Sequence, residues 1–417
     1  MKLLKVASLG SLLALTVLSA NAYDVTERFK LIDDKLKTES LLRPIGHDFF
    51  FDINIAANTN VTDVIDDVEK ATKAATVIAA NEVLSKYDKT EQAIKLGIGL
   101  GTPLPSFTAW DVSVKPNFRI FLDIGANLGI RSEILTLADV INFFPEGIPA
   151  DLKSFILTLT TPGTDVIVQC KANPGGVLSA NTVTFCGTQQ EGKYLIPSLT
   201  QAAPTLAVFG KADGKFGLFN DYTYGEHFFG NFNLYGMGRA DIYQLITARQ
   251  IASGQSIEAP KKMNTETSVQ ADYRFGYKNT NYTAFLGVEE LKLAKLKDAD
   301  VGSKTQTYGY KSLIRAHADA TYKYTVLTLQ PFVGFHKRSG YGFGDGVYAG
   351  AMAGAYLWGD RLGLQLRAMA DKQYLTITPR VKLWLMQLEY SMKNPMKSMD
   401  GDVKLSAIHS VDFRIFF

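Results

Sequence analysis

Long segments of the chain alternate apolar and polar residues with a period of two. In segment 118–130 all seven even positions are apolar, whereas most odd positions are charged, polar or glycine. The same alternation returns in segments 314–324, 361–371 and 403–417. Because successive side chains of a β-strand point to opposite faces, this period predicts strands with one wholly apolar face. Such runs are long for the strands of a soluble domain.

Short turn signals separate the strand-like segments. They lie at Asp213-Gly214, Asn279 to Asn281, Gly359-Asp360 and Asp400-Gly401. Each predicts an antiparallel hairpin between consecutive strands.

Strand length and the content of the second face predict where the apolar faces lie. A strand that crosses a membrane needs about 9 to 11 residues, and the alternating segments are at least that long. Their polar faces carry charges of both signs, which a water-lined lumen tolerates. We therefore expect an all-β fold, a transmembrane antiparallel β-barrel of roughly 12 to 16 strands with about 14 as the best estimate.

Three segments break the alternation. Residues 23–45 have helical or irregular character and predict a periplasmic or lumenal segment ahead of a barrel that spans 46–417. Residues 62–92 repeat apolar positions at spacings of three and four, which predicts a helical insertion with Thr62 as its cap. This insertion is either a surface helix in a long loop or a helix that enters or covers the lumen. Residues 132–200 predict a long loop, of the kind that carries function or covers an opening.

The N-terminal residues 1–22 predict a cleaved secretory signal peptide. A basic start precedes a short apolar run and the small-residue pattern ANA. Cleavage removes Lys2 and Lys5 and no acid, so the formal net charge falls from +3 to +1. A balance this close to zero gives no sign of a nucleic-acid partner.

The two cysteines, Cys170 and Cys186, predict a disulfide. An even count and a close spacing favour pairing in an exported protein, and two unpaired thiols are the alternative. The sequence contains no Cys/His cluster or calcium loop, so no metal and no cofactor is expected. The glycines of GIGLGT at 97–102 recur at period two, which favours a smooth strand face over a phosphate-binding loop.

The end of the chain alternates up to its last residue. SVDFRIFF at 410–417 places Phe413, Ile415 and Phe417 on one face. This ending resembles the assembly signal of Gram-negative outer-membrane β-barrel proteins. The resemblance implies insertion into the bacterial outer membrane by the barrel-assembly machinery, contact with outer-membrane lipid and lipopolysaccharide, and closure of the barrel between its first and last strands.

If the C-terminus is periplasmic, this strand count places some connections on the unexpected side of the membrane. It places the short Gly359-Asp360 turn outside and the glycine-rich segment 337–346 inside. This arrangement reverses the usual pattern of short periplasmic turns and long external loops, and it indicates a miscounted strand.

The polar faces predict the residues that line the lumen. The expected pore-lining residues are Arg119, Asp123, Arg131, Arg315, Asp319, Arg361, Arg367, Asp371 and Arg414. They form either the charged wall of a pore or a ladder of cross-strand ion pairs that satisfies the interior. We expect an outer-membrane channel or transporter for small polar solutes, gated or plugged by the helical insertion. A structural or adhesive surface protein with an occluded barrel is the alternative. No local motif links a nucleophile to any of the five His, so an enzyme is not expected.

Overall fold

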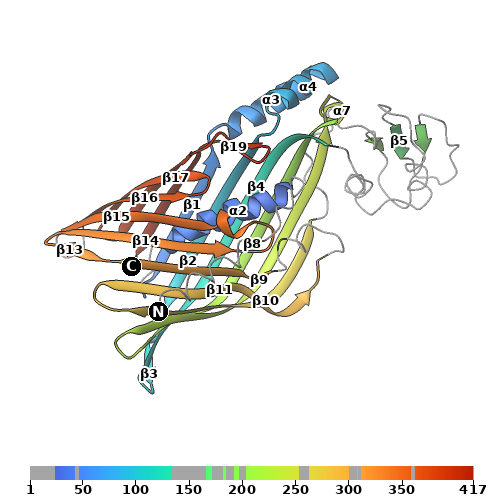
Figure 1. Cartoon of the computed structure of the whole chain (residues 1–417). Coiled ribbons are helices and arrows are strands. Elements are labelled where there is room, and N and C mark those ends of the chain that lie inside the picture. Colours follow the sequence, from blue (N-terminus) through green and yellow to red (C-terminus); the bar gives the residue numbers. More distant parts are fainter. Residues whose placement is uncertain are drawn as a thin grey trace, which may run out of the picture.

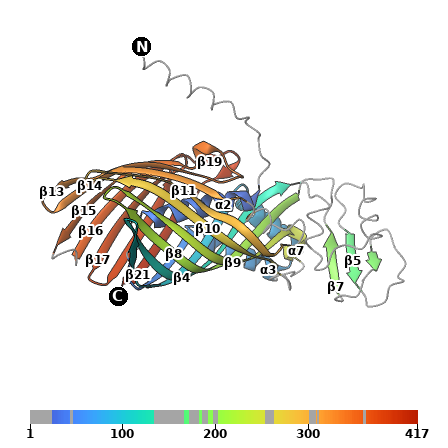
Figure 2. The same cartoon turned by 90° about the horizontal axis from the view of Figure 1, so that it is seen from below.

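Fourteen antiparallel strands close into a barrel in the computed structural model (Figures 1 and 2). The structure describes residues 24–42, 47–133, 166–170, 182–184, 192–196, 203–252, 263–299, 308, 311–357 and 362–416. The first strand, β1 (Phe50–Asn58), pairs with both β2 (Glu91–Pro103) and the last strand, β21 (Ile408–Phe416). This seam closes the sheet, so the predicted fold and the best estimate of the strand number are confirmed.

The other strands of the barrel follow one another around the wall. They are β4 (Val112–Glu133), β8 (Ala203–Tyr224), β9 (Phe228–Thr247), β10 (Asn264–Lys278), β11 (Tyr282–Lys297), β12 (Leu313–Ala320), β14 (Leu327–Lys337), β15 (Val347–Leu357), β16 (Leu362–Asp371), β17 (Tyr374–Leu383) and β18 (Met386–Pro395). Two short strands, β3 (Phe107–Ala109) and β13 (Tyr322–Tyr324), pair with β4 and β14. Outside the barrel, β19 (Met399–Asp400) pairs with β20 (Val403–Lys404), and β5 (Val166–Cys170), β6 (Thr182–Thr184) and β7 (Gly192–Ile196) form a small separate sheet.

The outer surface of the barrel is apolar and the inner surface is charged. Ile120 and Leu364 are 46% and 57% exposed, although both are large hydrophobic residues. In contrast, Arg315 and Arg414 are each 1% exposed. In a membrane barrel the outward side chains face lipid and the inward ones face the lumen. The apolar face of the alternating segments therefore lies outward.

The two rims of the barrel differ in the length of their connections. We call the rim at which β21 ends the C-terminal rim and the opposite one the loop rim. Residues 225–227, 279–281 and 384–385 form short turns at the C-terminal rim, whereas α3 (Val61–Ala74), α4 (Val77–Lys86) and segment 338–346 lie at the loop rim. β15 ends and β16 begins at the C-terminal rim, so the conflict over sidedness came from a missed hairpin. The missed hairpin joins β17 to β18 through a turn at Trp384, whose backbone is left-handed with φ 48°.

The predicted turn at Asp213-Gly214 is wrong, because β8 runs through both residues without a break. Asp213 points inward, where it accepts hydrogen bonds from Lys211 (2.7 Å) and Arg239 (2.6 Å). The aspartate therefore serves an ion pair inside the barrel. The Asp400-Gly401 turn is present between β19 and β20, where Gly401 has φ 61°.

The helical insertion forms two helices at the loop rim, α3 (Val61–Ala74) and α4 (Val77–Lys86) (Figure 1). They are separated by Ala75, whose φ of 51° ends α3, and Asn60 takes the N-cap position predicted for Thr62. Their buried stripe packs on α7 (Ala248–Ala252) and on the ends of β4, β8 and β9. Both helices lie at the loop rim (Figure 1), and the role of the insertion as a gate or plug of the lumen stays a prediction. None of the described helices is long and apolar enough to cross a membrane.

Candidate functional site

The lumen is occupied by a helix that precedes the first strand, α2 (Val25–Leu41) (Figure 2). Asp24 caps it by accepting hydrogen bonds from the backbone N–H of Thr26 (2.7 Å) and Glu27 (3.3 Å). Most of its side chains are buried, including the charged Asp33 and Asp34, which are 0% exposed. The segment 23–45, predicted as periplasmic or lumenal, thus has a helix within the barrel.

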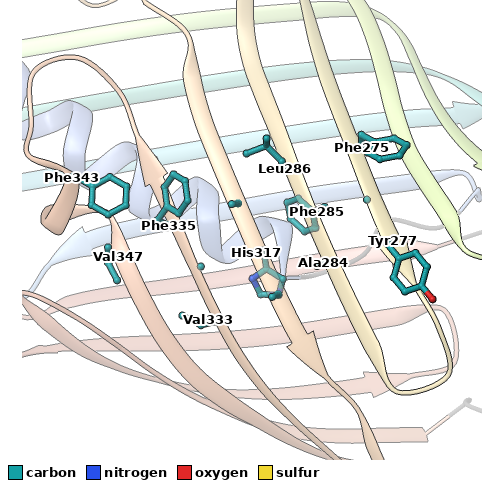
Figure 3. A pocket seen from close by; sticks show the side chains of 14 residues that line it. Phe275, Tyr277, Ala284, Phe285, Leu286, His317, Val333, Phe335, Phe343 and Val347 are labelled. Atoms are coloured by element: carbon teal, nitrogen blue, oxygen red, sulfur yellow. The ribbon is translucent and has the colours of Figure 1, made fainter. Parts of the chain in front are cut away.

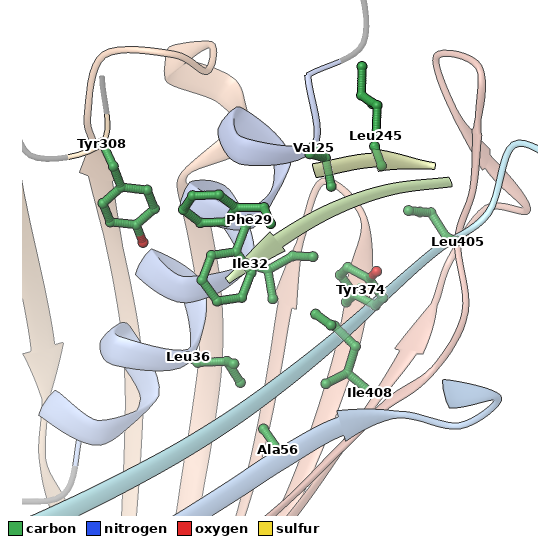
Figure 4. Close-up of a cluster of buried hydrophobic side chains, with 13 residues drawn as sticks. Val25, Phe29, Ile32, Leu36, Ala56, Leu245, Tyr308, Tyr374, Leu405 and Ile408 are labelled. Atoms are coloured by element: carbon green, nitrogen blue, oxygen red, sulfur yellow. The ribbon is translucent and has the colours of Figure 1, made fainter. Parts of the chain in front are cut away.

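One face of α2 is apolar and packs on the barrel wall. Val25, Phe29, Ile32 and Leu36 recur at helical spacing and contact inward residues of the strands (Figure 4). The Phe29 ring lies directly over Gly125 of β4, where an added Cβ would be 2.3 Å from the ring. A glycine at this position therefore lets the helix approach the wall closely.

Ion pairs fix the N-terminal half of α2. Arg28 contacts Glu91 of β2 (2.6 Å) and Asp400 of the β19–β20 hairpin (2.8 Å). Asp33 contacts Lys95 of β2 (2.5 Å) and Lys211 of β8 (3.1 Å). Burial alone would raise the pKa of the Asp400 carboxyl, but hydrogen bonds from Lys397 and Arg28 hold it below its usual range.

A buried cluster holds the middle of α2 against the segment that follows β14. Asp34 accepts two hydrogen bonds from the Arg338 guanidinium, at 2.9 and 3.0 Å, and one from the Tyr341 hydroxyl at 3.0 Å. Arg338 also contacts Glu290 at 2.9 Å. Hydrogen bonds between a guanidinium and a carboxylate in this bidentate geometry are strong and directional.

The C-terminal half of α2 is held in the same way. Lys35 contacts Asp371 of β16 (2.8 Å), and Lys37 contacts Glu290 (3.3 Å). Glu39 pairs with Lys393 of β18, and Arg315 of β12 donates to Thr38. Strands on several sides of the barrel thus bind one helix, and the helix occupies this part of the lumen.

A cavity of about 470 Å³ remains between α2 and the wall on the side of the C-terminal rim. Leu36, Lys37 and Ser40 of α2 form one side of it, and β1, β2, β4, β8 to β12 and β21 form the other. Its acidic lining residues are Asp52, Asp123, Asp213, Asp221, Asp272, Glu289 and Glu290. Its basic ones are Lys37, Lys95, Arg119, Lys215, Arg274, Arg315 and Arg414. The cavity therefore combines seven acidic and seven basic groups in a space that suits a small polar molecule.

The structure places four of the predicted pore-lining residues at this cavity. They are Arg119, Asp123, Arg315 and Arg414. Of the others, Arg367 pairs with Glu389 (3.0 Å), Asp371 with Lys35, and Asp319 accepts a hydrogen bond from Gln330 (2.8 Å). Arg131 lies at the end of β4 near the loop rim, and Arg361 lies outside the described residues. Many inward charges thus form ion pairs, and their role in passing a solute stays a prediction.

Sequence reasoning did not identify the charged residues of α2 or their partners Lys95, Lys211 and Arg338. The available signal was the charge density of KLIDDKLKTES at 30–40, combined with apolar residues at helical spacing. That pattern is also typical of a solvent-exposed helix.

Two other groups of predicted residues are placed only in part. Phe413 and Ile415 lie on β21 opposite Ile53 and Phe51 of β1, and Phe417 lies outside the described residues. Cys170 ends β5, whereas Cys186 and residues 1–22 lie outside the described residues, as does most of 132–200. The assembly signal, the disulfide and the signal peptide stay predictions.

His317 and Asp319 share the inner face of β12, with 3.5 Å between Nε2 and Oδ2. The His317 ring is stacked on Phe285, and its Nδ1 hydrogen-bonds the Tyr348 hydroxyl at 3.1 Å. These contacts describe a packed histidine. In the part of the chain that the structure describes, no group of three or more His, Cys, Asp or Glu could hold a metal ion.

The outer wall carries a shallow apolar hollow of about 660 Å³ across β10, β11, β12, β14 and β15 (Figure 3). Its lining includes the small residues Ala316, Ala318 and Gly334 and the exposed side chains of Leu286 and Phe343. Leu286 is 59% exposed, as expected for a side chain that meets lipid.

The chain was compared with known proteins. No protein-family model and no curated protein sequence matches it. Among solved structures, the transport unit of the autotransporter AIDA-I from Escherichia coli is 7% identical with a TM-score of 0.35, and 95% of this chain and 99% of that one are covered. A mutant of the Rh. blastica porin is 8% identical with a TM-score of 0.27, at 89% and 99% coverage. The P pilus usher (PapC) translocation pore is 6% identical with a TM-score of 0.24, at 88% and 99% coverage. Likeness at this level does not decide a function, which depends on the residues of the lumen.

Proposed function

We propose that this outer-membrane β-barrel protein is a channel or transporter for small polar solutes, and that α2 is the plug of its closed state. The observation that carries the proposal is a buried helix bound by ion pairs to the inner face of a charged barrel. Side-chain contacts of this kind can be exchanged for contacts with water or solute when the helix moves. The strands of the wall are joined by backbone hydrogen bonds, so they cannot move aside in this way.

The location of the barrel follows from its surfaces. A closed strand barrel satisfies its backbone hydrogen bonds internally, and an apolar outer face makes it soluble in a bilayer. The barrel lies in the bacterial outer membrane. Small solutes would enter the cavity at the C-terminal rim, and passage through the barrel would require displacement of α2.

A second candidate is a surface protein whose barrel is only a platform. The tight fit of Phe29 over Gly125 and the ion pairs on several sides of α2 favour it, because they describe a permanently filled interior. Under this alternative, the loop-rim segments would carry the function.

Single-channel conductance of the refolded full chain in planar bilayers separates the two candidates. Replacing Asp33 by Lys puts a positive charge beside Lys37, Lys95 and Lys211, and we expect repulsion to displace α2. Asp33→Lys should therefore give larger or more frequent current steps than the wild type. The matched control is Asp66→Lys, the same change on an exposed position of α3, which should conduct like the wild type.

Far-UV circular dichroism tests whether both variants retain the barrel. A folded Asp33→Lys variant that stays silent at all potentials would contradict the channel and support the surface protein.

A further inference from the structure

Two buried guanidinium groups of the cavity have nitrogen atoms without acceptors. Arg119 is 9% exposed and Arg414 is 1% exposed. Among the described residues, Nε and Nη2 of Arg119 have no hydrogen-bond partner. The same is true of Nε and Nη1 of Arg414. Buried polar groups are nearly always hydrogen-bonded, and a charged donor without an acceptor is costly. Both side chains line the same cavity, so the missing acceptor has a place to bind.

The surrounding side chains hold Arg119 in a fixed position. Its guanidinium carbon lies 5.6 Å from the centre of the Phe50 ring and 5.4 Å from that of Phe219. Gly101 makes room for this stack, because a Cβ there would be 2.2 Å from the Phe50 ring. Cation–π contacts of this kind stabilise the charge and orient the plane of the guanidinium without using its N–H donors.

The carboxylates near these groups do not satisfy them. Asp221 is the carboxylate paired with Arg119, but the distance of 3.7 Å from Nη2 is too long for a hydrogen bond. The Asp221 side chain is also 46% exposed. Asp52 engages Arg414 through Nη2 alone, at 2.6 Å. Donors on each arginine thus remain for another acceptor.

A third arginine adds positive charge to the same cavity. Arg274 of β10 lines it and lies over the face of Phe285, with 4.5 Å between the guanidinium carbon and the ring centre. Carboxylate and phosphate groups accept parallel hydrogen bonds from the planar guanidinium fork, whereas a neutral solute supplies weaker acceptors.

We propose that this cavity binds the carboxylate or phosphate group of a small anionic solute between Arg119 and Arg414. The site deepens the proposed function, on which it rests for its role in transport, by naming anions as the class of solute. Binding itself does not depend on movement of α2, since the cavity is present beside the plug.

The test is equilibrium dialysis of radiolabelled inorganic phosphate, and separately acetate, against the refolded full chain in detergent micelles. We expect saturable binding of one anion per chain, and no competition by methylammonium or glucose. Arg119→Gln and Arg414→Gln should each weaken binding about tenfold or more, and Arg119→Lys should weaken it less because the charge is kept. Lys382→Gln is the matched control, since Lys382 lies on β17 and does not line the cavity, and it should bind as the wild type does.

Circular dichroism and thermal unfolding identify any variant that has lost the barrel, and the competition experiment on the wild type needs no variant. Absence of saturable anion binding to the folded wild type would overturn the proposal. Equal affinity in the wild type and both Gln variants would overturn it too. If the wild type binds anions saturably but the Asp33→Lys variant conducts no current, the anion site is supported and the channel is contradicted. If the protein conducts current but binds no anion, the channel is supported and the anion site is contradicted.

Discussion

Asp34 of α2 and Arg338, just beyond β14, form a bidentate ion pair with distances of 2.9 and 3.0 Å, in which both side chains are at most 1% exposed. Removing one partner of a buried pair leaves the other charge uncompensated, which typically costs about 3 to 5 kcal/mol. We expect Arg338→Ala to lower the free energy of unfolding by about this amount and to increase the open probability. Urea unfolding in micelles and planar-bilayer recordings measure the two effects. Lys73→Ala, which removes an exposed ion pair with Glu69 on α3, should change little, and equal effects of both variants would contradict a plug held at Asp34.

Gly125 provides a second test of how α2 is seated. Gly125→Ala would place a Cβ 2.3 Å from the Phe29 ring, so the helix must shift away from β4. We expect a loss of roughly 1 to 3 kcal/mol of stability, as for overpacking in a core. Gly214→Ala on β8 is the control, because nothing lies within 4 Å of the added Cβ. Thermal unfolding compares them, and Phe29→Leu should partly restore the Gly125→Ala variant if the clash with the ring is the cause.

Acid should loosen the N-terminal half of α2. The pKa of Asp400 is held below its usual value by Lys397 and Arg28, so its ionised form stabilises the folded state. That contribution is complete above the usual carboxyl pKa of about 4 and is lost as the pH falls through the lower pKa of the folded state. We expect conductance to be constant from about pH 8 to 5 and to rise only below about pH 4. Asp400→Asn should show the raised conductance already at neutral pH, and a variant that keeps the wild-type profile would rule out this tether.

The outer face can be tested independently of the lumen. Leu366 lies near the middle of β16 and is 52% exposed. Leu366→Lys places a charge toward the hydrocarbon, which costs about 2 to 4 kcal/mol at the bilayer midplane. Unfolding from liposomes measures this loss. Ile78→Lys, at a position of α4 that is 73% exposed at the loop rim, should be nearly neutral.

The barrel was predictable from the sequence because its signal is local. Alternation along segment 118–130 and near the C-terminus identifies lipid-facing sides without knowledge of any partner strand. The prediction of a turn at Asp213-Gly214 was wrong because the role of Asp213 is not local: it depends on Arg239 on the neighbouring strand. A dipeptide rule cannot include that contact.

The position of α2 inside the barrel was not predictable for a related reason. Charged side chains on several faces of α2 are compatible with solvent exposure, and only their distant partners distinguish burial. Asp34 and Arg338 are 304 positions apart in the chain. The candidate anion site combines Arg119 and Arg414, both of which were predicted to face inward, but the position of the Arg119 guanidinium depends on the packing of Phe50 and Phe219.

The seam between β1 and β21 has a consequence for biogenesis. Because α2 lies in the chain directly before β1, it is tethered beside the edge that must find the last strand. It contacts Lys95 on β2, on one side of this junction, and Lys393 on β18, on the other. We therefore expect the helix to bring the two ends of the sheet together during barrel closure, after which the closed wall encloses it.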